Sequence, residues 1–555
     1  MTYQAPPRKA LSAALAAQFL AKPAPSGFIY KRRADPMPEA AGRIPSPQQA
    51  ALFDWVRNGC GSAVVQAVAG AGKTTSLVWA LGYMTGDIFF GAYNKKIAEE
   101  IAAKAEKAGV MRGGLRISTM HAAGFATWMR FADPQRQRTC DVDDRKTSKI
   151  VDGLIWDDKP KYQPLLSCMG FVGKMVSFAK QFLIGVNSDP RELQPWLDIV
   201  AHFGTDEELP ENADLRAILA LVVDVFIASK AACKKIIDFD DMIYAPLAWN
   251  LRFYQNDWVL VDEAQDTNPA RREMARRMLK PDGRLIAVGD SRQAIYGFTG
   301  AGADSLERIS VDFNCIQLPL TITYRCPKAV VSFAHQWVSH IEAADTAPEG
   351  VVRDMILPPV AEGEAVQPWF VIERPHHTSA ILCRFTKPLV KTAYGMLRRG
   401  IPCKIEGRDL AKGLVALCRR WKLSSTGKLN ERLESYLALE IAKARAAGSE
   451  RREQDVIDRV ETIRVFIERC NAAGHRTIDA LCAEIESIFA DGVENCCTLS
   501  TGHKAKGREW PVVYWLTSTK QVSRKDWEHV QEDNIKYVIT TRAQSELVLI
   551  PEGMQ

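Results

Sequence analysis

Several features are missing from this sequence. No apolar run approaches the ~20 residues that a membrane-spanning helix needs. No cysteine pair has the Cys-x-x-Cys spacing of a metal site, and no internal repeat recurs at a fixed period. These absences exclude a membrane-embedded protein, a zinc ribbon and a solenoid. What remains is a chain of 555 residues with 47% hydrophobic and 25% charged residues, a globular composition too long for one core.

The cysteines and the net charge give weaker indications. The thirteen cysteines are scattered and odd in number, which predicts reduced core thiols in a protein from a reducing compartment. With no secretory signal evident, we expect a cytoplasmic, nucleoid-associated protein, or a nuclear one if the source is eukaryotic. The net charge of +6 permits a polyanionic partner without establishing one.

The beginning of the chain differs from the rest. Residues 1–34 contain no acidic residue but several basic ones, among them Lys31, Arg32 and Arg33. We interpret residues 1–43 as a flexible, basic N-terminal arm rich in proline and alanine. A transit peptide is the alternative interpretation.

After this arm, short apolar strands alternate with helical stretches. The strands are followed by polar or glycine residues, as in a doubly wound parallel sheet. A first series of expected strands comprises Ala63–Val65, Ile88–Phe90, Trp258–Val261 and Leu285–Val288. A second series comprises Ala380–Cys383, Cys403–Ile405, Thr498–Leu499, Val512–Trp515 and Leu547–Ile550. The sequence therefore predicts an α/β fold of two parallel-sheet domains.

Two helical segments interrupt these series. Residues 126–235 lack the strand-loop pattern, and residues 411–495 are helical and charged, with a break at Gly448-Ser449. The charges of the second segment are those of a solvated face. The expected division is 44–125 with 236–320 for the first domain, 321–410 with 496–555 for the second, and the helical segments as inserted subdomains.

A glycine-rich loop follows the first strand. Residues Ala67–Thr74 read AVAGAGKT and fit the phosphate-loop pattern, except that Ala67 stands where the first glycine is usual. Small residues let backbone N–H groups close around a β-phosphate, and the following helix adds its positive dipole end. Lys73 supplies a charge for the β- and γ-phosphates, and Thr74 offers a hydroxyl to Mg²⁺.

Two adjacent carboxylates end a later strand. Asp262 suits the Mg²⁺ shell, and Glu263 suits a general base that polarises the attacking water. Together with the loop around Lys73, they predict hydrolysis of a nucleoside triphosphate. They do not indicate what the hydrolysis drives.

Longer motifs resemble a known family. The string DEAQD at Asp262–Asp266 and the string VGDSRQAIYGFTGA at Val288–Ala301 resemble the UvrD/Rep/PcrA family of superfamily 1 helicases. The string YNKKIA at Tyr93–Ala98 favours the shorter F-box-helicase-like branch. The resemblance extends in order over about residues 45–550. It implies two RecA-like domains (1A and 2A), helical inserts (1B and 2B), and an ATP-dependent helicase whose ATP hydrolysis DNA stimulates.

The resemblance also assigns residues to the nucleotide. It places Gln49 and Tyr324 at the adenine, Glu509 near the ribose, and Gln293 between the γ-phosphate and the DNA. The expected ATP-binding residues are Gln49, Ala69, Gly70, Ala71, Gly72, Lys73, Thr74, Thr75, Tyr324 and Glu509. The expected catalytic residues are Lys73, Glu263, Gln293, Arg325 and Arg542, with Thr74 and Asp262 on the metal.

Two arginines lie far along the chain from Lys73. The resemblance makes Arg325 and Arg542 the residues that reach the γ-phosphate. Arginines that close onto a phosphate from a second domain stabilise the transferred phosphoryl group only when the cleft is closed. Hydrolysis would then be linked to domain motion.

The DNA-facing motifs supply aromatic faces for stacking and polar groups for phosphates. The expected DNA-binding residues are Tyr93, Asn94, Thr119, His121, Tyr296, Phe298 and His503. The family commonly has Trp-Arg where this chain has Phe298-Thr299, so one cationic contact is absent. Asp238–Met242 also resembles a family signature, for which we expect a structural role.

Three functions stay open from the sequence. The first is a monomeric motor on single-stranded DNA and single/double-strand junctions, moving 3′-to-5′, in repair, replication or recombination control. Its partners would be replication or recombination proteins. The second is an ATP-driven remodeller that strips proteins from single strands with little unwinding. It is favoured by the second insert, which is shorter than in full-length members of the family. The third is an ATP-switched nucleic-acid-binding module. Sensitivity to the 2′-OH would separate DNA from RNA.

Overall fold

The structure is a computed structural model, and it divides into two units, residues 1–44 and Pro45–Gln555. The structure describes residues 44–554 except 136, 138–139, 158–159, 161–164, 166–167, 206–208, 210–212, 296–303, 358–366, 398, 400, 407, 447–449, 489–494 and 518–525. The expected arm 1–43 lies outside the described residues, as do Tyr296 and Phe298.

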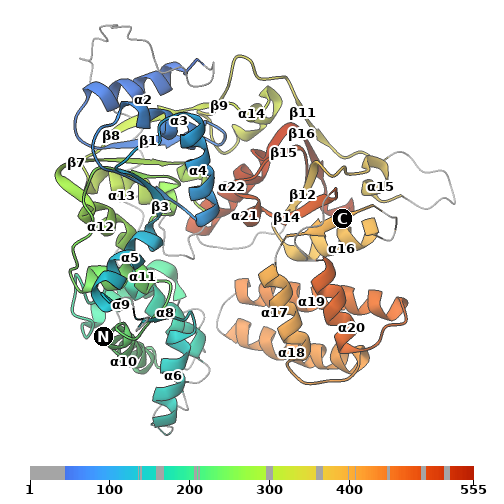
Figure 1. Cartoon of the computed structure of the whole chain (residues 1–555). Coiled ribbons are helices and arrows are strands. Elements are labelled where there is room, and N and C mark those ends of the chain that lie inside the picture. The colour runs from blue at the N-terminus through green and yellow to red at the C-terminus, as the bar shows by residue number, and fades with distance from the viewer. Residues whose placement is uncertain are drawn as a thin grey trace. The chain divides into compact units, whose positions relative to one another are not determined.

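A six-stranded sheet forms the first lobe (Figure 1). Its order is β3-β2-β6-β7-β1-β8, and every neighbouring pair is parallel. The strands are β1 (Ala63–Ala67), β2 (Ile88–Ala92), β3 (Leu115–Thr119), β6 (Asn256–Val261), β7 (Leu279–Gly289) and β8 (Ile316–Leu320). The central strands are covered on both faces, which is why they are continuous apolar runs instead of alternating with polar residues.

The helices of the first lobe begin at residues that satisfy free backbone N–H groups. Ser46 and Gln49 form a reciprocal capping box at the first helix, and Asn94, Thr119 and Asn268 cap three others. The helices are α2 (Pro47–Asn58), α3 (Lys73–Ala80), α4 (Lys95–Lys107), α5 (Met120–Ala132), α11 (Asp241–Ala248), α12 (Pro269–Arg277) and α13 (Ser305–Asp312).

The first insert is helical. It contains α6 (Lys146–Asp157), α8 (Met169–Gln181), α9 (Leu193–Phe203) and α10 (Leu215–Ala232), and a two-stranded ladder of β4 (Asp141–Val142) and β5 (Ile236–Ile237). The expected boundary at residue 126 falls inside α5. A buried ion cluster joins the insert to α11. Lys180 contacts Asp238 at 2.5 Å and Asp241 at 2.9 Å, and Lys146 contacts Asp241 at 2.6 Å.

A second six-stranded parallel sheet forms the second lobe (Figure 1). Its order is β11-β16-β15-β12-β14-β13. The strands are β11 (Val351–Asp354), β12 (Ser379–Cys383), β13 (Cys403–Ile405), β14 (Cys497–Thr501), β15 (Trp510–Leu516) and β16 (Ala543–Ile550). The helices are α14 (Lys328–Ala334), α15 (Trp369–Glu373), α16 (Thr386–Leu397), α21 (Gly502–Ala505) and α22 (Asp526–Thr540); β9 (Ile322–Thr323) pairs with β10 (Glu342–Ala343). The predicted α/β class with two parallel sheets is confirmed.

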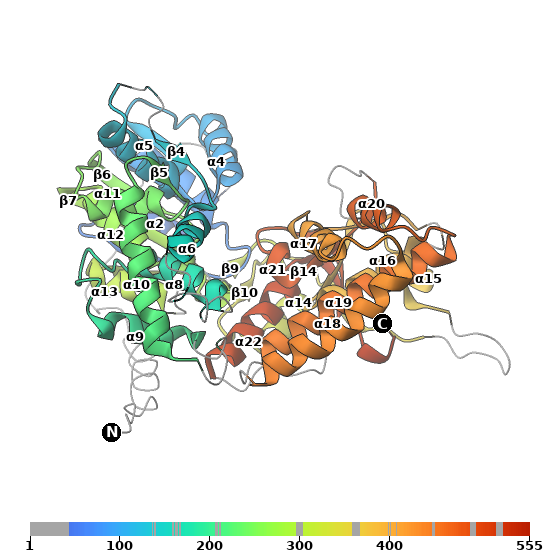
Figure 2. The ribbon, with the colours of Figure 1, turned by 90° about the horizontal axis from the view of Figure 1, so that it is seen from below.

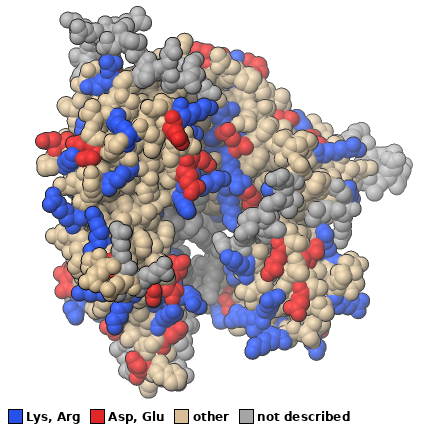
Figure 3. Space-filling model, in the orientation of Figure 1, with Lys and Arg blue, Asp and Glu red and all other residues tan. Residues whose placement is uncertain are grey.

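The second insert is a group of four helices (Figure 2). They are α17 (Arg408–Arg419), α18 (Thr426–Ala446), α19 (Glu450–Ala472) and α20 (Ile478–Ile488). Their buried side chains belong to the same apolar cluster as those of the second sheet, so this insert packs directly on its lobe. In the view of Figure 3, basic and acidic side chains are interspersed over the surface.

Two properties of the whole described chain complete the fold. All thirteen cysteines are free thiols, and eleven of them are buried. Across the described ranges, no helix combines the length and the apolar character that a bilayer crossing requires.

Candidate nucleotide-binding site

Three sequence motifs meet at one edge of the first sheet. The phosphate loop follows β1, Asp262 and Glu263 follow β6, and Asp290 follows β7. β7 is the neighbour of both β1 and β6, and all three strands are parallel. Their carboxyl ends therefore converge, which is where open α/β sheets bind ligands.

The loop conformation depends on glycine. Gly70 and Gly72 both have a φ of +74°, in the left-handed region that side chains disfavour. A Cβ at Gly70 would also lie 2.5 Å from the Thr323 hydroxyl oxygen and 2.6 Å from the Arg325 Cβ. A side chain at residue 70 is thus excluded by the second lobe as well as by the backbone.

Thr74 and Asp262 fit a magnesium ion. The Thr74 hydroxyl donates to the Asp262 carboxylate at 2.7 Å, so a hydroxyl and a carboxylate oxygen lie side by side at the start of α3. Mg²⁺ prefers oxygen ligands and is held by few protein groups together with phosphates and water. Within the described ranges no three His, Cys, Asp or Glu residues are grouped as a metal site.

The pKa values of the two strand-end carboxylates are shifted in opposite directions. Burial, and then the Glu263 charge, raises the pKa of Asp262 to about 6. Burial acts on Glu263 in the same direction, but the charges of Lys73 and Lys506 outweigh it and hold the pKa of Glu263 below its usual value. Lys73 Nζ lies 3.4 Å from a Glu263 oxygen. Glu263 is therefore ionised at neutral pH, as a group that polarises water must be.

Both arginines expected from the second lobe contact residues at the nucleotide edge of the first. The backbone N–H of Tyr324 donates to the Gly70 carbonyl at 2.9 Å, which places Arg325 next to the phosphate loop. Arg325 Nε donates to Glu509 at 2.5 Å. Arg542 is 1% exposed, and its Nη2 lies 3.5 Å from the Gln293 side-chain oxygen. Burial, and then the charge of Arg325, lowers the pKa of Arg542 to about 9.

The residues expected at the adenine are Gln49, which contacts α3, and Tyr324, which contacts the phosphate loop. The Gln49 side chain is buried, donates to the Ser76 hydroxyl at 2.9 Å and accepts from the Ser46 N–H at 3.0 Å. Its carboxamide is therefore engaged by the protein in this conformation. The Tyr324 side chain is 53% exposed, so its ring is open to a stacking partner.

Two further residues contact this site and were not among the expected ones. Tyr537 accepts the Ala69 N–H at 2.9 Å. Lys506 donates to Asp266 at 2.6 Å and to the Gln293 carbonyl at 2.8 Å. In the sequence, Lys506 lies in the string Thr498–Trp510 and Tyr537 in the string Tyr537–Ala543, both of which resemble motifs of the family. Their contacts depend on how the second lobe meets the first, and chain order does not show that.

Two of the expected DNA-binding residues of the first lobe, Tyr93 and His121, line one cavity of about 360 Å³ together with Arg271. Asn94 and Thr119 also cap α4 and α5, with side-chain oxygens that accept from the N–H groups of residues 97 and 122. Burial, and then the Arg271 charge, lowers the pKa of His121 to about 3, so its ring is neutral.

Phe239 is an additional aromatic residue on this cavity. Its ring stacks on His121 with centroids 3.8 Å apart, and its side chain is 54% exposed. The structural role expected for Asp238–Met242 fits the buried Asp238 and Asp241 but not Phe239. An apolar residue inside a run of acids was the signal in the sequence. His503 lies in the first turn of α21 in the second lobe.

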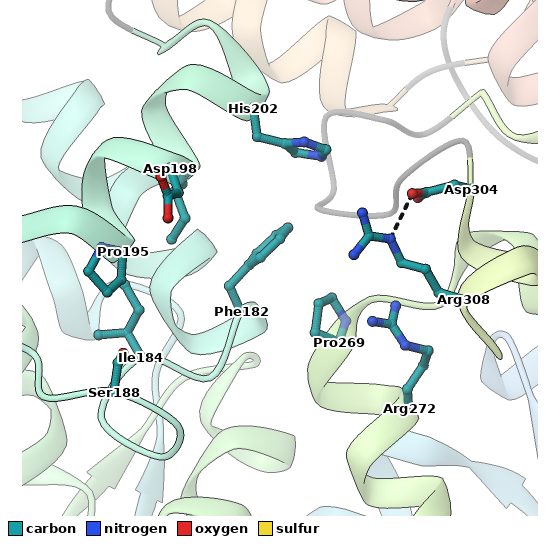
Figure 4. A pocket seen from close by; sticks show the side chains of 11 residues that line it. Phe182, Ile184, Ser188, Pro195, Asp198, His202, Pro269, Arg272, Asp304 and Arg308 are labelled. Carbon is teal, nitrogen blue, oxygen red and sulfur yellow. Dashed lines mark hydrogen bonds and ion pairs between the residues drawn. The ribbon is translucent and has the colours of Figure 1, made fainter. Parts of the chain in front are cut away.

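A separate cavity of about 290 Å³ lies between α9, α12 and α13 (Figure 4). Arg308 and Arg272 line it from one side, and Phe182 and His202 from the other. Each arginine is already paired, Arg308 with Asp304 at 2.7 Å and Arg272 with Asp312 at 3.0 Å. The cationic charge is thus compensated, and we assign no ligand to this cavity.

The fold and this geometry define a class. Two parallel-sheet lobes, a phosphate loop with its acidic partner strand on the first, and Arg325 of the second beside that loop are the features of the phosphate-loop nucleotide-binding class. Residues 48–314 match the family model described as the UvrD/REP helicase N-terminal domain.

Curated relatives agree with this assignment. The chain is 26% identical over 326 residues to the ATP-dependent DNA helicase Rep of Salmonella typhimurium, covering 52% of this chain and 42% of Rep. It is 26% identical over 309 residues to the ATP-dependent DNA helicase PcrA of Staphylococcus epidermidis, covering 51% and 39%. F-box DNA helicase protein 1 of Schizosaccharomyces pombe is 25% identical over 325 residues, covering 54% and 34%. The matches thus span less than half of each relative.

Proposed function

We propose that this chain is an ATP-dependent motor that moves along single-stranded DNA and acts as a helicase or translocase. The observation that carries the proposal is the position of Arg325 and Arg542 on the second lobe. Arg325 adjoins Gly70 of the phosphate loop through the Tyr324–Gly70 hydrogen bond, and Arg542 lies 3.5 Å from the Gln293 side chain of the first lobe. A nucleotide held between the lobes would connect its own hydrolysis to their relative motion.

Each residue around the phosphates has a separate task. Lys73 and the loop N–H groups hold the β- and γ-phosphates, and Thr74 and Asp262 hold Mg²⁺. When bound, the ion neutralises charge on the phosphate oxygens. Glu263, which is ionised, orients and deprotonates the attacking water. Gln49, Ala69–Gly72, Thr75 and Glu509 complete the proposed ATP-binding set, with Tyr324 against the adenine.

Arg325 and Arg542 supply positive charge to the leaving phosphoryl group from the second lobe. In this conformation Glu509 and Gln293 are their side-chain partners. Phosphate oxygens would replace these neutral or singly charged acceptors. Gln293 lies just before the expected DNA-binding residues Tyr296 and Phe298. It would lose its contact with Arg542 when a phosphate oxygen takes its place.

The strand is proposed to cross the aromatic cavity of the first lobe. Tyr93 and Phe239 offer ring faces, the neutral His121 supports the Phe239 ring from behind, and Arg271 offers a nearby charge. Stacking on ring faces tolerates any base sequence, which suits a translocating motor. Asn94 and Thr119 are proposed contacts to the DNA backbone, and His503 is proposed to link the phosphate site to the DNA site. Movement in the 3′-to-5′ direction, action at single/double-strand junctions and a monomeric state complete the proposal.

A direct test is the steady-state ATPase rate of the full chain with Mg²⁺, with and without poly(dT). We expect DNA to raise turnover by at least about tenfold, a coupling of the usual size between two sites. Lys73→Ala supplies the background rate. Poly(U) in place of poly(dT) reports whether the 2′-OH matters. Turnover that ignores both polymers would favour the ATP-switched binding module instead.

The reduced second insert favours a second candidate function. In its described part, the second insert consists of α17–α20 on the second lobe, and α17 begins at Arg408, three residues before the expected boundary. Translocation needs the two lobes, whereas unwinding also needs contacts to duplex, so the motor could strip proteins from a single strand with little unwinding. Strand displacement and removal of a single-strand-binding protein, measured on the same preparation, separate these functions.

Replacing Phe239 by alanine is expected to weaken binding of single-stranded DNA about tenfold, because one stacked base contributes roughly 1–3 kcal/mol. The side chain is half exposed, so the free energy of unfolding should change little. Fluorescence anisotropy of labelled oligo-dT measures the affinity. Tyr254→Ala is the control, since Tyr254 is also exposed but precedes β6, at the opposite edge of the sheet. Equal affinity of the two variants would contradict the proposed strand path.

A further inference from the structure

A cavity of about 690 Å³ lies on the first lobe where several strands of its sheet begin, and its size is usual for a ligand pocket. Arg116 of β3 and Tyr254, just before β6, line it, and Arg130 joins them from the last turn of α5. The nucleotide residues follow the opposite ends of these parallel strands. None of the residues expected at the ATP or DNA sites lines this cavity.

Arg116 is held in one position and keeps hydrogen-bond donors free. Its Nη2 donates to the Asn256 side-chain oxygen at 2.7 Å, and its guanidinium carbon lies 3.6 Å from the centroid of the Tyr254 ring. Asn256 is itself fixed, because its Nδ2 donates to the Tyr254 and Met278 carbonyls at 3.1 and 3.0 Å. A guanidinium has several N–H donors, so Arg116 offers a preorganised cation to a ligand.

Arg130 adds a second cation to the same cavity. Its Nη2 donates to the Thr127 hydroxyl at 3.2 Å. Across the residues that the structure describes, neither Arg116 nor Arg130 forms an ion pair with a carboxylate. The arginines of the 290 Å³ cavity, in contrast, are each paired with an aspartate. The positive charge of the larger cavity is thus left for an anion from outside the chain.

Two carboxylates near this cavity already have donors of their own. Asp133, which lines it, is buried and accepts the Gln137 N–H at 2.8 Å. Asp87 accepts from Lys280 at 2.9 Å and from the Tyr254 hydroxyl at 3.1 Å. Neither carboxylate is therefore positioned to neutralise the two arginines.

Much of the remaining wall is apolar. Phe253 and Met278 are buried residues that line the cavity, and Ala126, Met129 and Pro134 line it as well. Methionine side chains adapt to apolar groups of different shapes. A small inorganic anion would leave this surface unused. The cavity instead fits a ligand that carries a carboxylate next to a large apolar group.

The geometry favours a peptide over a nucleic acid. Bases stack on open ring faces. Arg116 covers one face of the Tyr254 ring, and Phe253 is buried. Clustered arginines are a recurring means of recognising acidic peptide motifs, and their fork matches the two oxygens of a carboxylate.

We propose that the cavity around Arg116 and Arg130 is a docking site for an acidic peptide segment of a partner protein. The carboxylates of the segment pair with the two arginines, and an adjacent aliphatic or aromatic side chain packs against Phe253 and Met278. The arginines select the charge, and the apolar wall selects the neighbouring residue. The inference does not depend on the proposed motor function, because it concerns a surface separate from the nucleotide site.

The test is fluorescence anisotropy of the full chain with short labelled peptides. In each peptide an Asp-Asp-Glu run is followed by one large apolar residue, and all such residues are tried in turn. We expect the best acidic peptide to bind at least about tenfold more tightly than its counterpart with Asn-Asn-Gln, and to bind more weakly at high salt. Serine in place of the apolar residue should also weaken binding.

Variants assign the binding to this cavity. Arg116→Gln and Arg130→Gln should each weaken binding of the acidic peptide about tenfold, because each removes a charged hydrogen-bond donor. The ATPase rate and the melting temperature should stay close to those of wild type, since both arginines are exposed. Arg216→Gln is the matched control. Arg216 is also exposed, on α10 of the first insert, and it does not line the cavity.

Weaker binding in both cavity variants, with Arg216→Gln equal to wild type, supports the docking site. Failure of every acidic peptide to bind, or equal binding of the amide counterparts, overturns it. Equal affinity of wild type and both cavity variants also overturns it, because the peptide then binds elsewhere. Displacement of the peptide by oligo-dT, with weaker oligo-dT binding in the cavity variants, overturns it in favour of a nucleic-acid contact.

Discussion

Glu263→Gln is expected to lower ATP turnover by roughly 10²–10⁴-fold, the usual contribution of a general base. The amide keeps the shape of the side chain but cannot accept a proton from water. Nucleotide affinity should not fall, because removing the carboxylate charge releases Lys73, 3.4 Å away, for the phosphates. Single-turnover hydrolysis and binding of a fluorescent ATP analogue measure the two quantities separately.

Glu273→Gln is the matched control for this substitution. Glu273 lies on α12 of the same lobe, and its carboxylate pairs with Arg276 and Arg277 near the surface. Turnover of this variant should stay within about twofold of wild type. If Glu263→Gln retained turnover to within tenfold of wild type, the assignment of the base would be wrong. The lowered pKa of Glu263 also predicts that a loss of wild-type turnover near pH 5 will not come from protonation of this base, which loses its charge only at lower pH.

Arg542→Lys is expected to reduce DNA-stimulated turnover by roughly 10³–10⁵-fold, the range that an arginine finger contributes. Lysine keeps a positive charge but lacks the planar fork that reaches Gln293 and a phosphate together. The Arg542 guanidinium also donates to the Val538 and Arg508 carbonyls, at 2.9 and 3.0 Å, so alanine would disturb the second lobe itself. The lysine variant is therefore the informative one, and its melting temperature should be measured alongside kcat.

Arg353→Lys provides the comparison on the second lobe. Arg353 pairs with Glu373 and Glu546 near β11 and touches no residue of the nucleotide site. We expect turnover within about twofold of wild type. Equal kcat for Arg542→Lys and Arg353→Lys, with both proteins folded, would show that Arg542 takes no part in hydrolysis.

The phosphate loop and its partner strand were predictable for a local reason. A glycine-rich turn after a buried strand, with Lys73 and Thr74 at the next helix, encodes its own geometry, because Gly70 and Gly72 are required by their backbone angles. Asp262 and Glu263 were predictable in the same way, since they directly follow an apolar run. The pairing of Thr74 with Asp262 follows from two parallel strands ending at one edge.

Other residues were outside the reach of sequence patterns. Phe239 lies in a string dominated by buried acids, and only the packing of α11 against the first insert leaves its ring exposed beside His121. Tyr537 and Asn534 resemble other helix residues until α22 is placed against Asp290–Ile295. Gln49 was expected to meet adenine, yet the fold shows its carboxamide engaged with Ser46 and Ser76.

The sequence by itself determined the α/β class, the two series of parallel strands and the chemical groups offered to a nucleotide, because strand periodicity, glycine conformation and adjacent carboxylates are local properties of the chain. Only the tertiary structure decided which groups of the second lobe meet the first. Contacts such as Ala69 with Tyr537 and Asp266 with Lys506 join residues far apart in sequence. Their existence depends on how two separately folded sheets pack, and no short stretch of chain contains that information.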